Sequence, residues 1–353
     1  MKTVFSHCAS GHEPYLIAAG VGKQIGEVVV PQFPTYKAQP QILADWYGKD
    51  PKIFLDQTAG QITDKLGYHG DYREFIKINL REGENVKKEL IEHLRDFEAV
   101  SLTGTKKQFK NPEIGVSIGA VTYVPHLEKT HFIYPCTNSE IVDQSPYHIE
   151  GKEEFVKIAR KEEEQYKRVF IPEINTFSYK SREMLHNEVS TPPLKGSLIN
   201  QQNIEKGIFY NISGTGSELN TAVLDAVKKS NLVVYKPSFA DGPGIKSNPD
   251  VIFNSNCIAM VARAGWGTMW MCQRAEKPII APAFKENDDP ETYHNNITIE
   301  KVGLGVVFDD FDPSVIERAL ARTEIIKGLN KQLEMKFGTL DGLQYVAQKI
   351  QED

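Results

Sequence analysis

The residues between Arg263 and Pro282 combine arginine, glycine and threonine in an order that could bind a phosphate group. An apolar segment at 257–261 runs into the sequence Arg-Ala-Gly-Trp-Gly-Thr, a helix-compatible stretch follows, and a second apolar segment covers 278–281. A glycine turn between a strand and a helix exposes backbone N–H groups at the helix N-terminus, where the helix dipole also favours an anion. The glycines could equally serve only the backbone geometry of a tight turn, because motifs this short are not specific.

A second turn of small residues lies close to the N-terminus. It covers 6–11, after an expected strand at 3–5, and Pro14 opens a helix that we expect to end near Lys23. Proline suits the first helical turn because it lacks the N–H group that would have no partner there. His12 would lie at the carboxyl edge of the sheet, where α/β folds bind ligands, and an imidazole can remove a proton near neutral pH. Its alternative role is that of a helix-start residue bonded to the backbone.

Strands and helices alternate along the chain, and this order is typical of an α/β fold with parallel sheets and crossover helices. The expected strands cover 3–5, 26–30, 52–55, 114–124, 169–172, 207–212, 232–235, 251–253, 257–261, 278–281 and 305–308. The expected helices cover 14–23, 85–97, 153–168, a segment after Ser217, a segment that ends near Gly303, a segment from Pro313, and 340–351. Loops are expected at 103–113 and 136–152, and a linker between two domains at 190–206.

Composition limits the functions that the chain can have. Its 353 residues suit two domains rather than one core. A net charge of −6 with scattered basic residues gives no surface suited to nucleic acid. The 4 cysteines have no paired spacing and indicate reduced thiols in a cytoplasmic protein. There is neither a signal peptide nor an apolar run long enough to cross a membrane, so no integral membrane segment is expected.

Two groups of residues could bind a metal ion, and both have a simpler interpretation. His7, Cys8 and His12 lie close together, but no second cluster supplies further ligands. The acidic run at 309–312 is better explained by Asp312 as the cap of a helix that begins at Pro313. We therefore expect no metal site.

The order of motifs in the second half resembles the C-terminal domain of GT-B glycosyltransferases. It consists of the Ser-Gly-Thr-Gly turn at 213–216, the Arg-x-Gly-x-x-Thr turn, a Lys-Pro-Ile-Ile strand, an acidic segment with asparagine, a helix and a Gly-x-Gly strand. The pattern is most similar to that of UDP-glycosyltransferases and of the N-acetylglucosaminyltransferase that forms lipid II. The resemblance is specific over about 207–310. It is weaker at 1–25, where Ser-Gly-His-Glu-Pro resembles the family's Gly-His-x-x-Pro turn, and no family signature lies between 35 and 200.

The resemblance implies a fold and a division into domains. The fold would be α/β, with two Rossmann-like domains whose parallel sheets face each other across a cleft. An N-terminal domain of residues 1–195 would shape the acceptor side, and the C-terminal helix at about 338–353 would pack back onto it. A C-terminal domain of residues 206–335 would bind a nucleotide-sugar.

The resemblance also implies roles for individual residues. His12 matches the histidine that is the general base of UDP-glycosyltransferases, and Ser10 and Gly11 would lie on the acceptor side. The implied donor-binding residues are Gly214, Thr215, Gly216, Arg263, Gly265, Trp266, Gly267, Thr268, Asp289, Glu291 and Asn295. The residues themselves leave open whether Trp266 stacks on a base or packs a domain face. The carboxylate that would orient His12 is sought in the segment 92–98.

The chain departs from the family at two places. The family usually carries a glutamate three residues after the threonine of the Arg-x-Gly-x-x-Thr turn, where it binds the donor ribose. Met271 stands there in this chain, and a thioether accepts hydrogen bonds poorly. The family's acidic–Gln pair is replaced by Asp289-Pro290-Glu291. Both changes put the identity of the donor in question.

The function that the resemblance implies is sugar transfer. We expect a cytoplasmic hexosyltransferase that uses a UDP-linked nucleotide-sugar and an unidentified hydroxyl acceptor, inverts the anomeric centre, and needs neither a metal nor another cofactor. Two alternatives remain open on the same fold. One is a nucleotide-sugar epimerase or hydrolase, and the other is a non-catalytic nucleotide-sugar binder, which Met271 favours.

Overall fold

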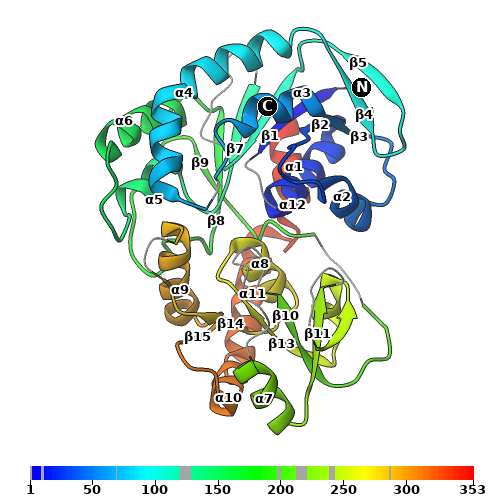
Figure 1. Ribbon diagram of the computed structural model, residues 1–353, viewed down its shortest axis with the longest axis vertical. Coiled ribbons are helices and arrows are strands. Elements are labelled where there is room, and N and C mark those ends of the chain that lie inside the picture. The colour runs from blue at the N-terminus through cyan, green and yellow to red at the C-terminus, as the bar shows by residue number, and fades with distance from the viewer. Residues whose placement is uncertain are drawn as a thin grey trace.

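The computed structural model describes residues 2–8, 12–68, 70–119, 129–196, 200–211, 221–237, 243–285 and 288–353. These residues form two β-sheets with helices packed around them, one in the upper half and one in the lower half of Figure 1. In the described residues the upper sheet has the strand order β5-β4-β3-β2-β1-β6-β7-β8-β9, and the lower sheet has the order β12-β11-β10-β13-β14-β15. The chain therefore contains two α/β domains, as the sequence predicted.

The strands and helices have the following bounds. The upper strands are β1 (Thr3–Cys8), β2 (Glu27–Pro31), β3 (Ile53–Asp56), β4 (Phe97–Ser101), β5 (Lys106–Phe109), β6 (Ile114–Ile118), β7 (Lys129–Ile133), β8 (Arg168–Pro172) and β9 (Glu188–Thr191). The lower strands are β10 (Gly207–Asn211), β11 (Val233–Pro237), β12 (Ile245–Ser247), β13 (Cys257–Ala262), β14 (Ile279–Pro282) and β15 (Gly305–Phe308). The helices are α1 (His12–Ile25), α2 (Gln39–Tyr47), α3 (Gln57–Asp64), α4 (Tyr72–His93), α5 (Asn138–Asp143), α6 (Lys152–Glu163), α7 (Thr221–Lys229), the 3₁₀ helix η1 (Pro249–Phe253), α8 (Trp266–Arg274), α9 (Pro290–Val302), α10 (Pro313–Leu320), α11 (Thr323–Phe337) and α12 (Gly342–Gln351).

The central strands of both sheets are parallel. In the upper sheet Val4 of β1 pairs with Val28 of β2 on one side and with Ile114 of β6 on the other. In the lower sheet β13 runs parallel to both β10 and β14. The carboxyl ends of parallel strands meet at one edge of a sheet, and that edge is where such folds place their ligands. Among the described strands, the exception is one edge of the upper sheet, where β4 is antiparallel to both β3 and β5.

Several predicted elements were wrong. The helix expected at 85–97 is α4, which begins at Tyr72 because Asp71 caps it by accepting bonds from the N–H groups of Arg73 and Glu74. It ends at His93, and Phe97 already belongs to β4.

The two expected loops each contain an element, β5 in 103–113 and α5 in 136–152. The segment 251–253 is part of the 3₁₀ helix η1 rather than a strand. The expected helix at 153–168 ends at Glu163, and β8 begins at Arg168. The strand expected to extend to 124 ends at Ile118, and residues 120–128 lie outside the described residues.

The chain passes between the two halves twice. The chain leaves the upper sheet after Thr191 and enters the lower sheet at Gly207, and the boundaries expected at 195 and 206 lie within this crossing. At its end the chain returns to the upper half, where α12 packs against α1 (Figure 1). The guanidinium of Arg168 then donates to the carboxylate of Asp353 over 2.6 Å.

Buried apolar side chains form one continuous cluster across the two halves. It includes Tyr15 and Leu16 of α1, Trp266 and Met269 of α8, and Val346 of α12. The first turn of α8 is therefore held against the upper domain by packing as well as by polar contacts. Within the described parts of the chain, every helix is too short or too polar to span a bilayer.

Candidate functional site

The turn that opens α8 has the features expected of an anion site. β13 ends at Ala262, and α8 begins at Trp266 after the cap residue Gly265, which has no side chain to accept a bond from the first turn. The N–H groups of Thr268 and Met269 bond to the Gly265 carbonyl at 3.1 and 3.0 Å. The N–H groups nearer the start of a helix need acceptors from outside it, and an anion can supply them.

The start of α9 lies beside this turn. Asp289 caps α9 by accepting a bond from the Glu291 N–H over 2.9 Å, and Arg263 forms an ion pair with Asp288. Asn295 is fully buried and donates from Nδ2 to the Ala264 carbonyl over 2.8 Å. The two helix starts are thus tied together, and the segments 263–268 and 288–295 form one candidate site.

The resemblance implied that Asn295 contacts the donor sugar. Its buried Nδ2 also donates to Glu291 Oε1 over 3.2 Å, so the amide nitrogen is used for bonds within the protein. In this structure Asn295 supports the turn before α8, and a direct contact with a donor would require its side chain to be uncovered.

The carboxyl groups at the start of α9 are partly buried. Burial, and after it the negative charge of Asp289, raises the pKa of Glu291 from 4.5 to about 8. Burial also raises the pKa of Asp289. The hydroxyl of Tyr134, from the upper domain, hydrogen-bonds Glu291, and Tyr147 donates to the Asp288 carbonyl over 2.9 Å. Glu291 is only partly exposed, and its burial favours the neutral form of the carboxyl group.

Trp266 links α8 to the upper domain. Its side chain is buried, its ring lies 5.2 Å from that of Trp270, and its indole N–H donates to Thr176 Oγ1 over 2.7 Å. The Thr176 carbonyl in turn accepts from the hydroxyl of Thr298 on α9 over 2.8 Å. The sequence left open whether Trp266 packs a domain face or stacks on a base. In this structure the ring packs against the upper domain and is not available for stacking.

His294 makes a second polar link between the domains. Its Nε2 lies 2.7 Å from the Gln144 carbonyl, and its Nδ1 lies 2.8 Å from the Tyr179 hydroxyl. A carbonyl can only accept, so Nε2 carries the proton and Nδ1 accepts from the tyrosine. Burial lowers the pKa of His294, which keeps the ring neutral in this network.

Some predicted site residues cannot be placed. Gly214, Thr215 and Gly216, together with Ser10 and Gly11, lie outside the described residues. His12 is the first residue of α1, whereas the helix was expected to begin at Pro14, and the His12 side chain lies outside the described part of the chain.

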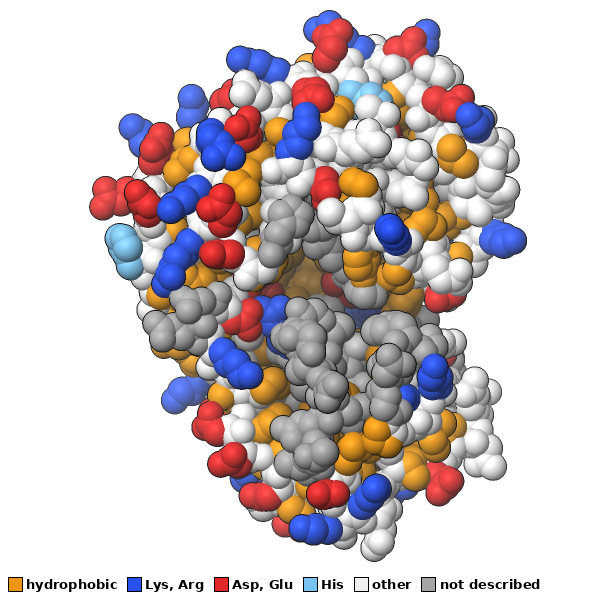
Figure 2. Space-filling model, viewed as in Figure 1, with side chains coloured by type: hydrophobic (Ala, Val, Ile, Leu, Met, Phe, Trp, Pro, Cys, Tyr) orange, Lys and Arg blue, Asp and Glu red, His pale blue; other side chains and the backbone are white. Residues whose placement is uncertain are grey.

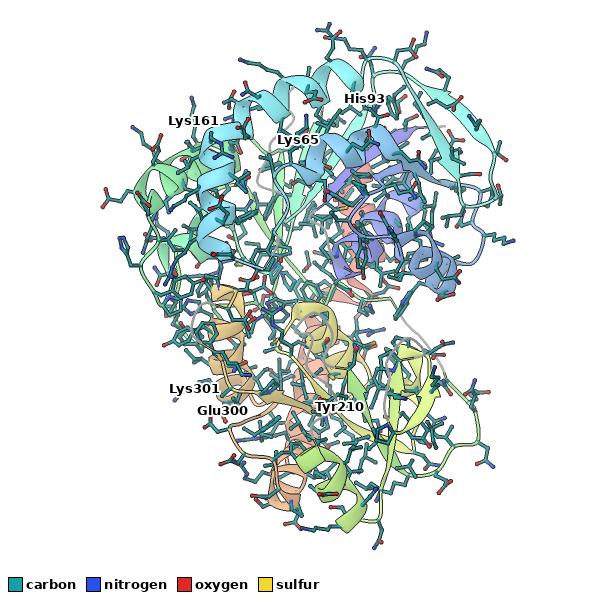
Figure 3. The ribbon with its side chains drawn as sticks, in the orientation of Figure 1. Lys65, His93, Lys161, Tyr210, Glu300 and Lys301 are labelled. Atoms are coloured by element: carbon teal, nitrogen blue, oxygen red, sulfur yellow. The ribbon has the colours of Figure 1, made fainter. Side chains whose placement is uncertain are left out.

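The segment 92–98, where a carboxylate partner for His12 was expected, is not at the site. Figure 3 shows His93 near the outer end of the upper domain, away from α8 and α9. The carboxylates of this segment form local ion pairs, Glu92 with Arg95 and Glu98 with Lys106. The expectation failed because α4 ends on the outer side of the domain rather than at the cleft.

Residues that the sequence did not single out also reach the site. An added Cβ on Gly267 would lie 2.5 Å from Glu13 Oε2, so Glu13 of the upper domain touches the first turn of α8. Lys195 donates to the same carboxylate over 3.1 Å. Glu13 could have been found from the sequence, because it lies within the turn that resembles Gly-His-x-x-Pro. No local motif marks Lys195. Met271, in the family's ribose-binding position, is buried in the core.

The prediction that Asp312 caps a helix is confirmed. Asp312 caps α10 by accepting from the Ser314 N–H over 2.7 Å. All four cysteines are buried and unpaired. Among the residues that the structure describes, no three His, Cys, Asp or Glu side chains gather closely enough to hold a metal ion.

Figure 2 shows the surface hollowed between the upper and lower halves. In Figure 1, α8 and the start of α9 lie on the side of the lower domain that faces the upper domain. The two helix starts therefore lie between the domains, and their role in binding a donor stays a prediction.

No protein-family model matches the chain, and no curated protein matches its sequence. Solved structures do match. CalG4, the calicheamicin glycosyltransferase, has a TM-score of 0.62 at 12% identity, over 100% of this chain and 98% of CalG4. Arabidopsis thaliana UGT89C1, solved with UDP-L-rhamnose, has a TM-score of 0.60 at 12% identity, over 98% of both chains. LpCGTa, solved with UDP, has a TM-score of 0.58 at 9% identity, over 99% of both chains.

The matches cover both domains from end to end, and their low identities make them evidence of fold. They do not distinguish the lipid II-forming transferase as a relative. The chain has the two-domain GT-B fold of glycosyltransferases, as its sequence motifs predicted.

Proposed function

We propose that this protein transfers a sugar from a nucleotide-sugar donor to a hydroxyl acceptor. The observation that carries the proposal is the first turn of α8, where Gly265 leaves the helix without a side-chain cap at the interface of the two domains. The donor diphosphate would bind there. The backbone N–H groups, the helix dipole and the nearby guanidinium of Arg263 would stabilise its charge without a metal.

A uridine donor is the first choice. Two proteins of the same fold were solved with UDP-L-rhamnose and with UDP. The buried Met271 supplies no hydrogen bond to a ribose, so nucleotide selectivity would have to come from other groups. The sugar would lie toward Asp289 and Glu291, at the start of α9.

The proposed chemistry is a single displacement. The acceptor oxygen attacks the anomeric carbon, the bond from that carbon to the diphosphate oxygen breaks, and the acceptor proton passes to the imidazole of His12. One displacement inverts the anomeric configuration. His12 is suited to the role because it begins α1 at the carboxyl edge of the upper sheet.

A nucleotide-sugar hydrolase or epimerase is the second candidate, and Glu291 favours it. Such an enzyme needs a second acid or base in addition to His12, and a carboxyl group with a pKa of about 8 can donate a proton at neutral pH. Incubation of the protein with UDP-glucose, without acceptor, separates the candidates. A hydrolase releases glucose, an epimerase forms a second UDP-sugar, and a transferase leaves the donor intact.

The donor assignment is tested by thermal shift with nucleoside diphosphates and nucleotide sugars. Ligand that binds only the native state raises the melting temperature. We expect at least one uridine nucleotide to do so with the wild type and not with G265V. No described atom lies within 4 Å of a Cβ added to Gly265, so this variant should fold and only obstruct the site. A full panel without a shift in the wild type would overturn the assignment.

A further inference from the structure

Glu13 and Lys195 form an ion pair at the point where α1, the interdomain crossing and α8 meet. Lys195 Nζ lies 3.2 Å from Glu13 Oε1 and 3.1 Å from Oε2. The same carboxylate lies against Gly267, since a Cβ built there would be 2.5 Å from Oε2 and 2.8 Å from Glu13 Cβ. A carboxylate of the upper domain therefore touches the first turn of α8.

Lys195 is in an unusual place for a cation. Its side chain is 5% exposed, and its ammonium lies 4.1 Å from the centre of the Trp46 ring. A buried ammonium group loses its hydration and requires an anion nearby. In this structure Glu13 is that anion, and the Trp46 ring adds a cation–π contact.

The first turn of α8 would favour an anion for an independent reason, because the free N–H groups and the positive end of the dipole lie at the N-terminus of a helix. Glu13 thus brings a negative charge close to the turn where the proposed function puts the donor diphosphate. A carboxylate and a diphosphate are both negatively charged, so they would repel each other if both lay at this turn. The diphosphate would, however, be an equally good partner for the Lys195 ammonium.

We propose that Lys195 is a ligand of the donor diphosphate and that Glu13 occupies its place in the unliganded protein. This inference rests on the proposed function and adds to it. On donor binding, the diphosphate replaces the Glu13 carboxylate as the partner of Lys195, and the Glu13 side chain turns away from Gly267. No bond other than hydrogen bonds and ion pairs is made or broken.

If the proposal is correct, substitutions of Glu13 and of Lys195 change the affinity for UDP in opposite directions. Glu13→Gln removes the competing charge and leaves Lys195 in place, so UDP should bind more tightly by about tenfold. Lys195→Met removes the ligand and leaves the competing carboxylate, so UDP should bind more weakly by about tenfold or more. An ion pair with a purely structural role would give changes of the same sign, because either variant would loosen the same contact.

The experiment is isothermal titration of UDP into the wild type, E13Q, K195M and K195R, with uridine as the ligand that lacks phosphates. K195R keeps the positive charge and should retain most of the UDP affinity. Uridine binding should be the same in all four proteins. Melting temperatures of the free proteins check that each variant is folded. If K195M does not fold, the direction in which E13Q changes the UDP affinity still tests the proposal.

The chain provides a matched control at the other end of α1. Lys23 Nζ lies 3.1 Å from Asp50 Oδ2 and 4.6 Å from the centre of the Tyr47 ring, an arrangement of the same kind in the last turn of α1. K23M and D50N should leave UDP affinity unchanged.

Three outcomes are distinguishable. Tighter UDP binding by E13Q together with weaker binding by K195M supports the proposal. UDP binding that is unchanged in both variants, or changed in the same direction, overturns it and leaves the proposed donor site standing. Failure of UDP to bind any of the proteins contradicts the proposed function, and the inference falls with it.

Discussion

Glu291 gives the protein a pH dependence that can be worked out from the structure. Its pKa is raised from 4.5 to about 8 by burial and then by Asp289. The native state therefore keeps a proton that the unfolded chain loses, and the free energy of unfolding falls as the pH rises from about 4.5 to about 8. Each pKa unit corresponds to about 1.4 kcal/mol, so the full effect is roughly 5 kcal/mol at most. Because solvent reaches the side chain in part, we expect about 1–3 kcal/mol.

The perturbation is E291Q, which keeps the shape and removes the titration. The melting temperature of E291Q minus that of the wild type should increase from pH 5 to pH 8 and become constant above pH 8. Taking the difference cancels the other titrating groups. E300Q is the matched control, because Glu300 lies on the same helix at its exposed end (Figure 3) and should leave the pH profile of the wild type unchanged. A difference for E291Q that does not vary with pH would refute the reasoning.

Three further predictions concern the contacts of α8 and the proposed base. G267A should lower the melting temperature because its Cβ would lie 2.5 Å from Glu13 Oε2, at a cost of about 1–3 kcal/mol, whereas G265A should not; equal melting temperatures would contradict the contact. T176V leaves the buried indole N–H of Trp266 without its acceptor, so the free energy of unfolding should fall by about 1–3 kcal/mol, and an unchanged denaturation curve would argue against the bond. H12A should lower turnover by about 10² to 10⁴ while UDP affinity measured by titration changes little, and a fully active variant would remove His12 from the mechanism.

Local signals in the sequence were enough to predict much of the lower domain. The Asp-Pro pair at 289–290 caps α9, and Gly303, with φ of 85°, ends it. Both features act within a few residues of the chain, so they can be identified without knowledge of the fold. The same is true of the turn from Arg263 into α8 and of Asp312 at the start of α10.

Elements whose structure depends on distant contacts were missed. β5 is Lys-Lys-Gln-Phe, with exposed polar side chains on an edge strand, and no apolar alternation marks it. In η1, Val251 and Ile252 are buried as in a strand, but the segment begins with Pro249 and forms a 3₁₀ turn. A short apolar run indicates burial and does not determine the type of backbone.

Candidate site residues were also predictable where a local motif marks them, and were missed where distant contacts bring them in. The glycine turn and the acidic segment could be found from their motifs, but their partners in the upper domain could not. Tyr134, Thr176 and Lys195 reach the site only because the two domains pack together, and each is far in sequence from the residue that it contacts. Asn295, which the resemblance assigned to the donor sugar, is buried and supports the turn before α8, and its contact with a donor stays a prediction.

The central claim is that the first turn of α8 holds the donor diphosphate, and amide hydrogen exchange with and without saturating UDP tests it most directly. We predict slower exchange in a peptide that covers 263–274, with no change in a peptide that covers α10 of the same domain. Saturating UDP that binds, as judged by titration, but leaves exchange in 263–274 unchanged would contradict the claim.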